Sequence, residues 1–310
     1  MTARIRTGTA AWADKALVDS GWYPADAHDP EAKLRYYASR FSVVENDSTY
    51  WAFPDEERVR TWAERAPAGF VMNIKAHALL TAHYAAARGL PRDVREGLSR
   101  ELLAKPHLYP RDLGAKRMRV LTQRFRDALA PLADAGKLGV VLFQFPVWFP
   151  ISAAHKDELV QIRDDFDGLR VAIELRNATW MTQDNRSETL DFLEKHELIY
   201  VCVDEPQGFI ASVPPIVAAT SDVAVVRMHG RNPERWRQRS GGKRRGGVAG
   251  WPYLYSHEEL VDWAARIRAV AARTDEVHVI FSNAPVTNAV RNAEELAELF
   301  SRTRRRKRAA

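Results

Sequence analysis

The sequence predicts an α/β protein of the (β/α)8 type, a TIM barrel made of a single domain. Eight short apolar runs alternate with amphipathic helical patterns, which indicates parallel strands joined by right-handed crossovers. The length of 310 residues suits eight such units. An open doubly wound sheet would need a glycine-rich first turn, and the turn here is Ala10-Ala11-Trp12-Ala13.

The expected strands are short runs rich in Val, Ile and Leu, the composition of strands in a parallel sheet. The run Val171–Leu175 is almost continuously apolar, as in a strand buried on both faces. In chain order the expected strands are Ile5–Ala10, Val43–Asn46, Phe70–Ala76, Leu138–Phe145, Leu169–Leu175, Leu198–Val203, Val223–Met228 and Val277–Ser282.

Helical periodicity fills most of the intervals between these strands. Asp55 follows Pro54 and is a suitable N-cap, and Ser256 with Glu259 forms a capping box. A weak helical pattern over Ala211–Thr220 is interrupted by two prolines. The stronger expected helices are Pro30–Phe41, Asp55–Ala66, Ala115–Ala135, Ala153–Phe166, Ser187–His196, Ser256–Ala272 and Val286–Arg302.

Two long loops leave the C-terminal ends of strands three and seven, at His77–Lys116 and Met228–Tyr255. Barrel enzymes build their sites on this face. The expected domain covers residues 1–301, and the basic segment 302–310 is expected to be a disordered tail because it has no apolar residue to anchor it.

Composition limits the class of protein. Hydrophobic residues make up 46% of the chain, which supports a full core and opposes intrinsic disorder. The sequence has neither an apolar stretch long enough for a membrane span nor a signal-peptide core, so we expect a cytoplasmic protein without membrane contact. The single cysteine, Cys202, excludes an internal disulfide and is expected to be a buried core residue.

The net charge of +6 is located in two basic segments. The tail Arg302–Arg308 contributes six positive charges, so the rest of the chain is formally neutral. A second cluster, between Arg231 and Arg245, contains Arg235, Arg237, Arg239, Lys243 and Arg244 against the single acid Glu234. These segments support one alternative, a protein that grips nucleic-acid phosphates, although basic tails are also common as solvated chain ends.

Polar residues follow most of the expected strands at their C-terminal ends, and in a barrel these ends converge on one mouth. Carboxylates beside Lys, Arg and His are the components of acid–base catalysis and anion binding. The candidate catalytic residues are Glu174, Asp204, His229, Lys75, Glu45 and Asp47. The candidate substrate-binding residues are Arg176, Arg227, Gln144, Asn283, His77, Trp12, Tyr50, Trp51, Trp180 and Tyr255.

Each of these residues also has a structural interpretation. Glu174 and Arg176 are two residues apart on one strand, so they point the same way and could brace the barrel as an ion pair. No metal and no cofactor are expected, because no short metal-ligand spacing occurs, Lys75, Arg176 and Arg227 would repel a cation, and no phosphate loop follows a strand.

Several motifs, in order over about residues 5–300, resemble the domain-of-unknown-function 72 family of YecE-like TIM barrels. They are GTAAW at 8–12, WYP at 22–24, YYASRFSVVE at 36–45, STYWAFP at 48–54, the Lys75–His77 end, LFQFP at 142–146, IELRNATW at 173–180, VVRMHGR at 225–231, YLYSHEEL at 253–260 and VIFSNAPVTNAVRNA at 279–293. The resemblance implies a TIM barrel with these residues lining its mouth and brings no activity with it.

The chain departs from the family pattern at two strand ends. Asp47 stands where the family often has Asn, which adds a negative charge. Ser282-Asn283-Ala284 replaces an FNND-like end, so an acid is missing there.

The leading hypothesis is an enzyme, of hydrolase or lyase type, that acts on a small polar and anionic substrate such as a sugar, a phosphate ester or a nucleotide. Glu174 or Asp204 would serve as general acid or base, assisted by His229 and Lys75, and Arg176 and Arg227 would hold the anion. The alternatives are the nucleic-acid-associated protein and a ligand-binding barrel without chemistry.

Overall fold

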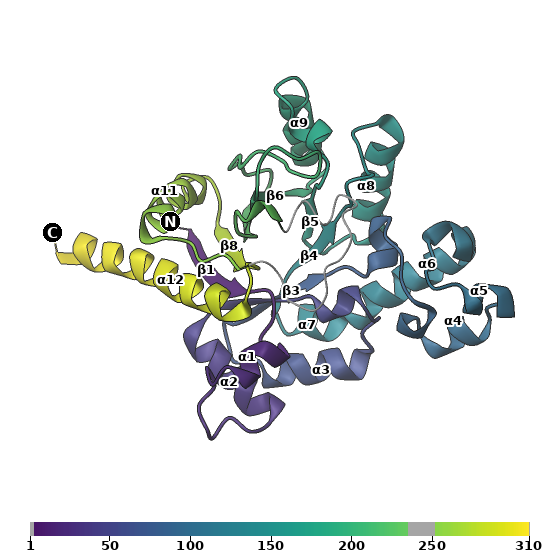
Figure 1. Ribbon diagram of the computed structural model, residues 1–310, viewed down its shortest axis with the longest axis horizontal. Helices are drawn as coiled ribbons and strands as arrows, with labels where there is room; N and C mark the ends of the chain where they lie inside the picture. The colour runs from purple at the N-terminus through teal and green to yellow at the C-terminus, as the bar shows by residue number, and fades with distance from the viewer. Residues whose placement is uncertain (1–2, 235–251, 310) are drawn as a thin grey trace.

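The computed structural model describes residues 3–234 and 252–309, and its strands form the predicted barrel (Figure 1). All seven neighbouring strand pairs are parallel, in the order β1-β8-β7-β6-β5-β4-β3-β2. The strands are β1 Arg4–Thr9, β2 Val43–Asn46, β3 Val71–Lys75, β4 Leu138–Gln144, β5 Val171–Glu174, β6 Ile199–Asp204, β7 Val223–Met228 and β8 Glu276–Phe281.

Helices surround the strands in Figure 1 and cover their outer faces. The predicted caps are confirmed: Asp55 accepts a hydrogen bond from Arg58 N, and both halves of the Ser256–Glu259 capping box are present. The helices are α1 Lys15–Asp19, α2 Pro30–Arg40, α3 Glu56–Arg65, α4 Arg92–Glu96, α5 Arg100–Ala104, α6 Pro110–Ala128, α7 Ala130–Asp134, α8 Ala153–Asp165, α9 Arg186–Lys195, α11 His257–Ala271 and α12 Val286–Ala309.

The expected helices at Ala115–Ala135 and Ala211–Thr220 differ from the structure. The expected helix Ala115–Ala135 is divided into α6 and α7, and α6 starts earlier, at Pro110, with a non-helical Gly114 inside it. Residues 211–219 are not helical, because Pro214 and Pro215 cannot supply the backbone N–H groups that a helix requires.

The last helix, α12, remains helical to Ala309 and so includes the backbone of residues 302–309, which was expected to be irregular. Arg and Lys have good helix propensity, and positive charge is favourable at a helix C-terminus, which accounts for the extension. The basic cluster expected in the β7 loop falls mostly on residues 235–251, which lie outside the described residues.

Strands β1 and β2 stand at the two ends of the hydrogen-bonded order, and the barrel is closed between them by a close approach and by side chains. A Cβ built on Gly8 would lie 1.9 Å from the carbonyl oxygen of Val43. Tyr37 Oη accepts a hydrogen bond from Thr9 N at 2.7 Å and lies 3.5 Å from Val43 O. Glycine at position 8 is therefore a requirement of the closed barrel.

The long loop after β3 has its own small apolar cluster. Leu79, Leu90, Leu108 and Leu121 are buried together there, outside the main core. The cluster fixes the short 3-10 helix η2, Ala78–Thr81, which leads into the residues that line one side of the barrel mouth.

Across residues 3–234 and 252–309, no helix has both the length and the apolar character needed to cross a membrane.

Replacement of Gly8 tests the closure of the barrel. We expect Gly8→Ala to lower the free energy of unfolding by about 1–3 kcal/mol, because the added methyl group forces β1 and β2 apart. The control is Gly97→Ala, where a Cβ would meet its nearest atoms at an ordinary 3.6 Å and we expect a change within about 0.5 kcal/mol. Denaturant unfolding measures both; equal stability of Gly8→Ala and the unmodified protein would contradict the assignment.

Candidate active site at the barrel mouth

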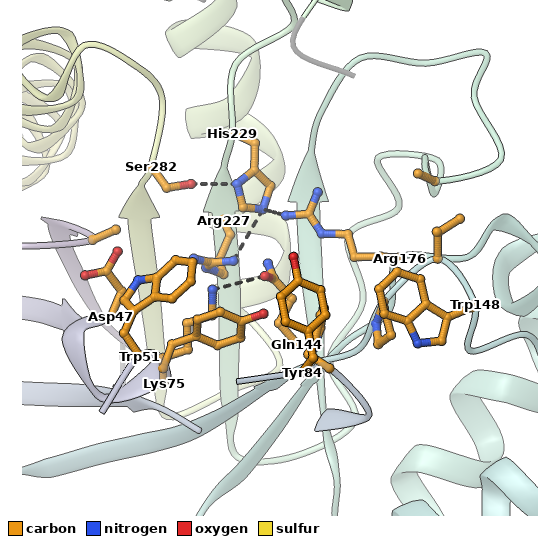
Figure 2. A pocket seen from close by; sticks show the side chains of 16 residues that line it. Asp47, Trp51, Lys75, Tyr84, Gln144, Trp148, Arg176, Arg227, His229 and Ser282 are labelled. Atoms are coloured by element: carbon orange, nitrogen blue, oxygen red, sulfur yellow. Dashed lines mark hydrogen bonds between the residues drawn. The ribbon is translucent and has the colours of Figure 1, made fainter. Parts of the chain in front are cut away.

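A cavity of about 560 Å³ opens at the C-terminal ends of the strands (Figure 2). Eight of the expected site residues line it: Asp47, Tyr50, Trp51, Lys75, Gln144, Arg176, Arg227 and His229. They come from β2, β3, β4, β5 and β7 and the turns that follow these strands. The barrel brings distant parts of the chain together here: Arg227, for example, binds Glu45, which lies 182 positions away in the sequence. The other lining residues are Ala10, His83, Tyr84, Pro146, Val147, Trp148, Ala211 and Ser282.

Glu174 lies at the centre of an ion-pair network beneath the cavity and is fully buried. Its Oε1 lies 2.5 Å from Arg176 Nη2 and accepts a hydrogen bond from Gln144 Nε2 at 2.7 Å. Its Oε2 is paired with Arg227 Nη1. Burial alone would raise the pKa of Glu174, but the charges of Arg176 and Arg227 hold it well below its ordinary value. Glu174 is therefore ionised near neutral pH.

Two further buried carboxylates complete the network behind the two arginines. Arg227 Nη2 donates to Glu45 Oε1 at 2.5 Å, and Arg176 Nη1 donates to Glu205 Oε2 at 2.6 Å. Glu205 is itself fixed by a hydrogen bond from Val213 N to its other oxygen at 2.8 Å. Each guanidinium is thus held between two carboxylates, which fixes its direction at the cavity wall.

His229 has close partners at both of its ring nitrogens. Nε2 lies 2.7 Å from Arg176 Nη2, which can only donate, and 3.1 Å from Glu174 Oε1, which can only accept. Nδ1 lies 2.6 Å from Ser282 Oγ, and either atom can donate. Burial, and then the charge of Arg176, hold the pKa of His229 well below its ordinary value. His229 therefore connects Ser282 to the Glu174–Arg176 ion pair.

Lys75 is the lining cation that is not paired directly with a carboxylate among the described residues. Its Nζ donates to Gln144 Oε1 at 3.0 Å and lies 4.5 Å from the centre of the Tyr50 ring. Burial, followed by the charge of Arg227, lowers the pKa of Lys75 to about 8. This lysine can therefore give up and take back a proton near neutral pH.

Asp47 is the carboxylate that lines the cavity. It precedes the 3-10 helix η1, Ser48–Tyr50, but its side chain does not cap that helix. Burial, followed by the charge of Glu45, raises the pKa of Asp47. The two ionisable groups that face the cavity without a fixed ion-pair partner, Asp47 and Lys75, thus both have pKa values moved toward neutrality.

Aromatic rings form much of the outer wall. Trp51, Trp148 and Tyr84 line the cavity and remain 71%, 53% and 41% exposed. His83 contacts both Tyr50 and Trp148 edge-to-face at 5.5 Å. Tyr84 and Trp148 were not among the expected site residues, and Ser282 was expected only as the end of the last strand. The signals were present: Trp148 follows Gln144 at the end of β4, Tyr84 lies in the long loop after β3, and Ser282 directly follows β8.

Trp12 and Trp180 do not line the cavity, which corrects the expectation of stacking faces there. Trp12 is carried outward by the turn after β1 and packs edge-to-face against Trp62, at 5.9 Å, in a groove between α2 and α3. Trp180 is fully buried and donates its indole N–H to Phe149 O at 2.7 Å.

Four more expected site residues are buried beside the mouth and have structural partners. Arg231 Nε contacts both oxygens of Asp204, at 3.1 and 2.9 Å, and Gly230 N donates to Tyr255 Oη at 2.9 Å. Asn283 Nδ2 donates to Tyr253 O at 2.9 Å, which holds the chain after β8. His77 accepts a hydrogen bond from Leu79 N and stacks on Phe53 at 4.1 Å.

No group of three or more His, Cys, Asp or Glu side chains suited to a metal ion occurs in the described ranges. Arg176 and Arg227 occupy the positions between the buried carboxylates. The expectation of no metal and no cofactor stays a prediction.

Replacement of Arg227 tests the buried network. We expect Arg227→Met to lower the free energy of unfolding by about 3–5 kcal/mol at pH 7, because Glu45 and Glu174 lose a shared cation while they remain buried. The matched control is Arg170→Met, which removes an exposed pair with Asp222 and should cost under about 1 kcal/mol. Equal losses in denaturant unfolding for the two variants would contradict a buried, mutually dependent network.

Lys75 should make stability depend on alkaline pH. Its pKa is lowered from 10.5 to about 8, so between these values the unfolded chain holds a proton that the folded protein does not. Stability due to Lys75 therefore rises with pH from about 8 to 10.5, and below pH 8 the group imposes its full penalty.

We expect Lys75→Met to be more stable than the unmodified protein at pH 7, by on the order of 2 kcal/mol, and to lose this advantage by pH 10.5. Exposed Lys116→Met provides the control, with a difference from the unmodified protein that does not change with pH. Unfolding curves at several pH values measure both, and a pH-independent difference for Lys75→Met would be inconsistent with the lowered pKa.

The comparisons with known proteins agree with the barrel and its motifs. The family described as "Protein of unknown function DUF72" matches residues 6–310. The UPF0759 protein YunF of Bacillus subtilis (strain 168) is 29% identical over 298 residues, which cover 96% of this chain and 94% of YunF.

Two solved structures extend this likeness to three dimensions. DUF72 family proteins of Enterococcus faecalis V583 and Thermotoga maritima MSB8 are each 25% identical to this chain, with TM-scores of 0.73 and 0.71. Each alignment covers 96% of this chain, and 98% and 99% of the two neighbours. Because the family match spans nearly the whole sequence, this protein belongs to the DUF72 family.

Proposed function

We propose that this protein is an enzyme that performs acid–base chemistry, of hydrolase or lyase type, on a small polar anion bound at the barrel mouth. The observation that carries the proposal is Lys75, a cavity-lining lysine with a pKa of about 8. General bases work best when their pKa lies near the operating pH, and a lysine reaches that range only in a site that desolvates it.

The charge of the cavity wall supports an anionic substrate. Three cations, Lys75, Arg176 and Arg227, line the cavity against one carboxylate, Asp47. The carboxylates that balance the guanidinium groups are buried behind them, and each has at least one oxygen paired with an arginine. A substrate anion would therefore contact the guanidinium groups of Arg176 and Arg227 and not the carboxylates behind them.

In this proposal the candidate catalytic residues have different roles. Lys75 accepts a proton from the substrate and, as its ammonium form, returns it in the second half of the reaction; Asp47 lines the same cavity. Glu174 is a positioning residue, because it orients Arg176, Arg227 and Gln144 and stays ionised. Asp204 is bound to Arg231 and is likewise a positioning residue.

The two alternatives have less support. Contact with nucleic-acid phosphates would use the basic loop and tail, whose side chains lie almost entirely outside the described residues. A ligand-binding barrel without chemistry would have no need of a lysine and an aspartate whose pKa values are both moved toward neutrality.

Lys75→Met separates the enzyme from the binding barrel. Candidate phosphorylated and carboxylated metabolites are first screened by thermal shift, and turnover of those that bind is followed by NMR. In the unmodified protein we expect kcat to rise with pH and level off above about pH 8, as Lys75 loses its proton.

We expect Lys75→Met to lower kcat by about 10²–10⁴-fold while the ligand still binds. Lys116→Met, on the exposed surface of α6, is the control and should retain full kcat. Turnover that survives in Lys75→Met would remove the lysine from the mechanism, and ligand binding without turnover in the unmodified protein would favour the non-catalytic barrel.

A further inference from the structure

Three exposed aromatic side chains gather at the barrel mouth. Eight large hydrophobic side chains are exposed among the described residues, and the three aromatic ones, Trp51, Tyr84 and Trp148, all line the cavity at the barrel mouth. In Figure 2 Trp51 and Trp148 lie on opposite sides of the view, with Tyr84 between them. Exposed rings that border one cavity mark a binding surface.

These rings are held in fixed orientations by their neighbours. The indole N–H of Trp148 donates to Ala82 O at 3.1 Å, so its polar atom is already engaged. Tyr84 packs on the ring of His107 at 4.0 Å, and Trp51 meets Tyr50 edge-to-face at 4.9 Å. A ligand ring that stacks on them would lose little side-chain entropy from the protein.

The lining of the cavity is largely apolar in its outer part and polar in its inner part. The loop residues that accompany the three rings, Pro146, Val147 and Ala211, are apolar. The residues at the strand ends, Lys75, Gln144 and Arg227, are polar or charged. The three ring faces of the outer part suit a flat aromatic ring, which stacks on such faces.

We propose that the ligand joins a flat aromatic ring to an anionic group, the chemistry of a nucleoside monophosphate, with the ring among Trp51, Tyr84 and Trp148 and the anion beside Lys75 and the two arginines. The inner half of this proposal rests on the proposed function; the ring site does not. The cavity of about 560 Å³ has the size of sites that hold ligands of this class.

Four probes test the two halves separately: adenosine 5′-monophosphate, ribose 5-phosphate, adenosine and inorganic phosphate. Binding is measured by calorimetry and by quenching of tryptophan fluorescence. Base–aromatic stacking contributes about 1–3 kcal/mol, so we expect adenosine 5′-monophosphate to bind at least about 10-fold tighter than ribose 5-phosphate.

Replacement of one ring then locates the site. We expect Trp148→Ala to weaken adenosine 5′-monophosphate about 10-fold and to leave ribose 5-phosphate unchanged, while Trp148→Phe, which keeps a ring face, retains most of the affinity. The control is Val261→Ala, which alters an exposed apolar residue of α11 away from the cavity. Unchanged affinity for ribose 5-phosphate shows that Trp148→Ala is folded.

The outcomes distinguish the two proposals. Equal affinity for adenosine 5′-monophosphate and ribose 5-phosphate overturns the ring site and leaves the anion site standing. Adenosine that binds as tightly as its monophosphate overturns the anion site and supports the ring site. Failure of all four probes to bind overturns both.

Discussion

The pairing of Glu174 with Arg176 and Arg227 is the interaction on which the barrel mouth depends. A carboxylate with no exposure cannot stay ionised without cations at contact distance, and neither guanidinium could be buried without carboxylates. Each arginine in turn has a second buried carboxylate partner: Arg227 pairs with Glu45, and Arg176 pairs with Glu205. Strands β2, β5 and β7 are thereby tied together at their C-terminal ends by buried ion pairs.

The same requirement decides which groups are available for chemistry. Glu174 is the most central carboxylate, yet its oxygens are held by Arg176, Arg227 and Gln144, so it cannot act as a base near neutral pH. Lys75 shares the environment without a direct carboxylate partner, and its pKa falls because burial and Arg227 both oppose its charge. The ion pairs of Glu174 thus form a fixed floor of the site, and Lys75 at its wall is the group suited to proton transfer.

Barrel and loops contribute different parts of the cavity. The strands supply the charged floor with fixed geometry, which the close approach of Gly8 to Val43 and the Tyr37 hydrogen bond at the β1–β2 junction help to maintain. The loops after β2, β3 and β4 supply Trp51, Tyr84 and Trp148. Placement of charged groups on strands and of apolar rings on loops suits a ligand with two chemically different ends.

The sequence by itself determined the barrel, because eight apolar runs alternating with helical patterns admit few other topologies, and it determined that charged strand ends such as Lys75, Glu174 and Arg227 share one face. It also supplied the caps at Asp55 and Ser256, which are local signals. Only the tertiary structure decided that Trp12 and Trp180 turn away from the mouth, that Trp148 and Tyr84 border it, and that Arg176 binds Nε2 of His229. Ring direction and ion-pair partners depend on contacts between residues far apart in the chain, and a single sequence carries no local signal for those contacts.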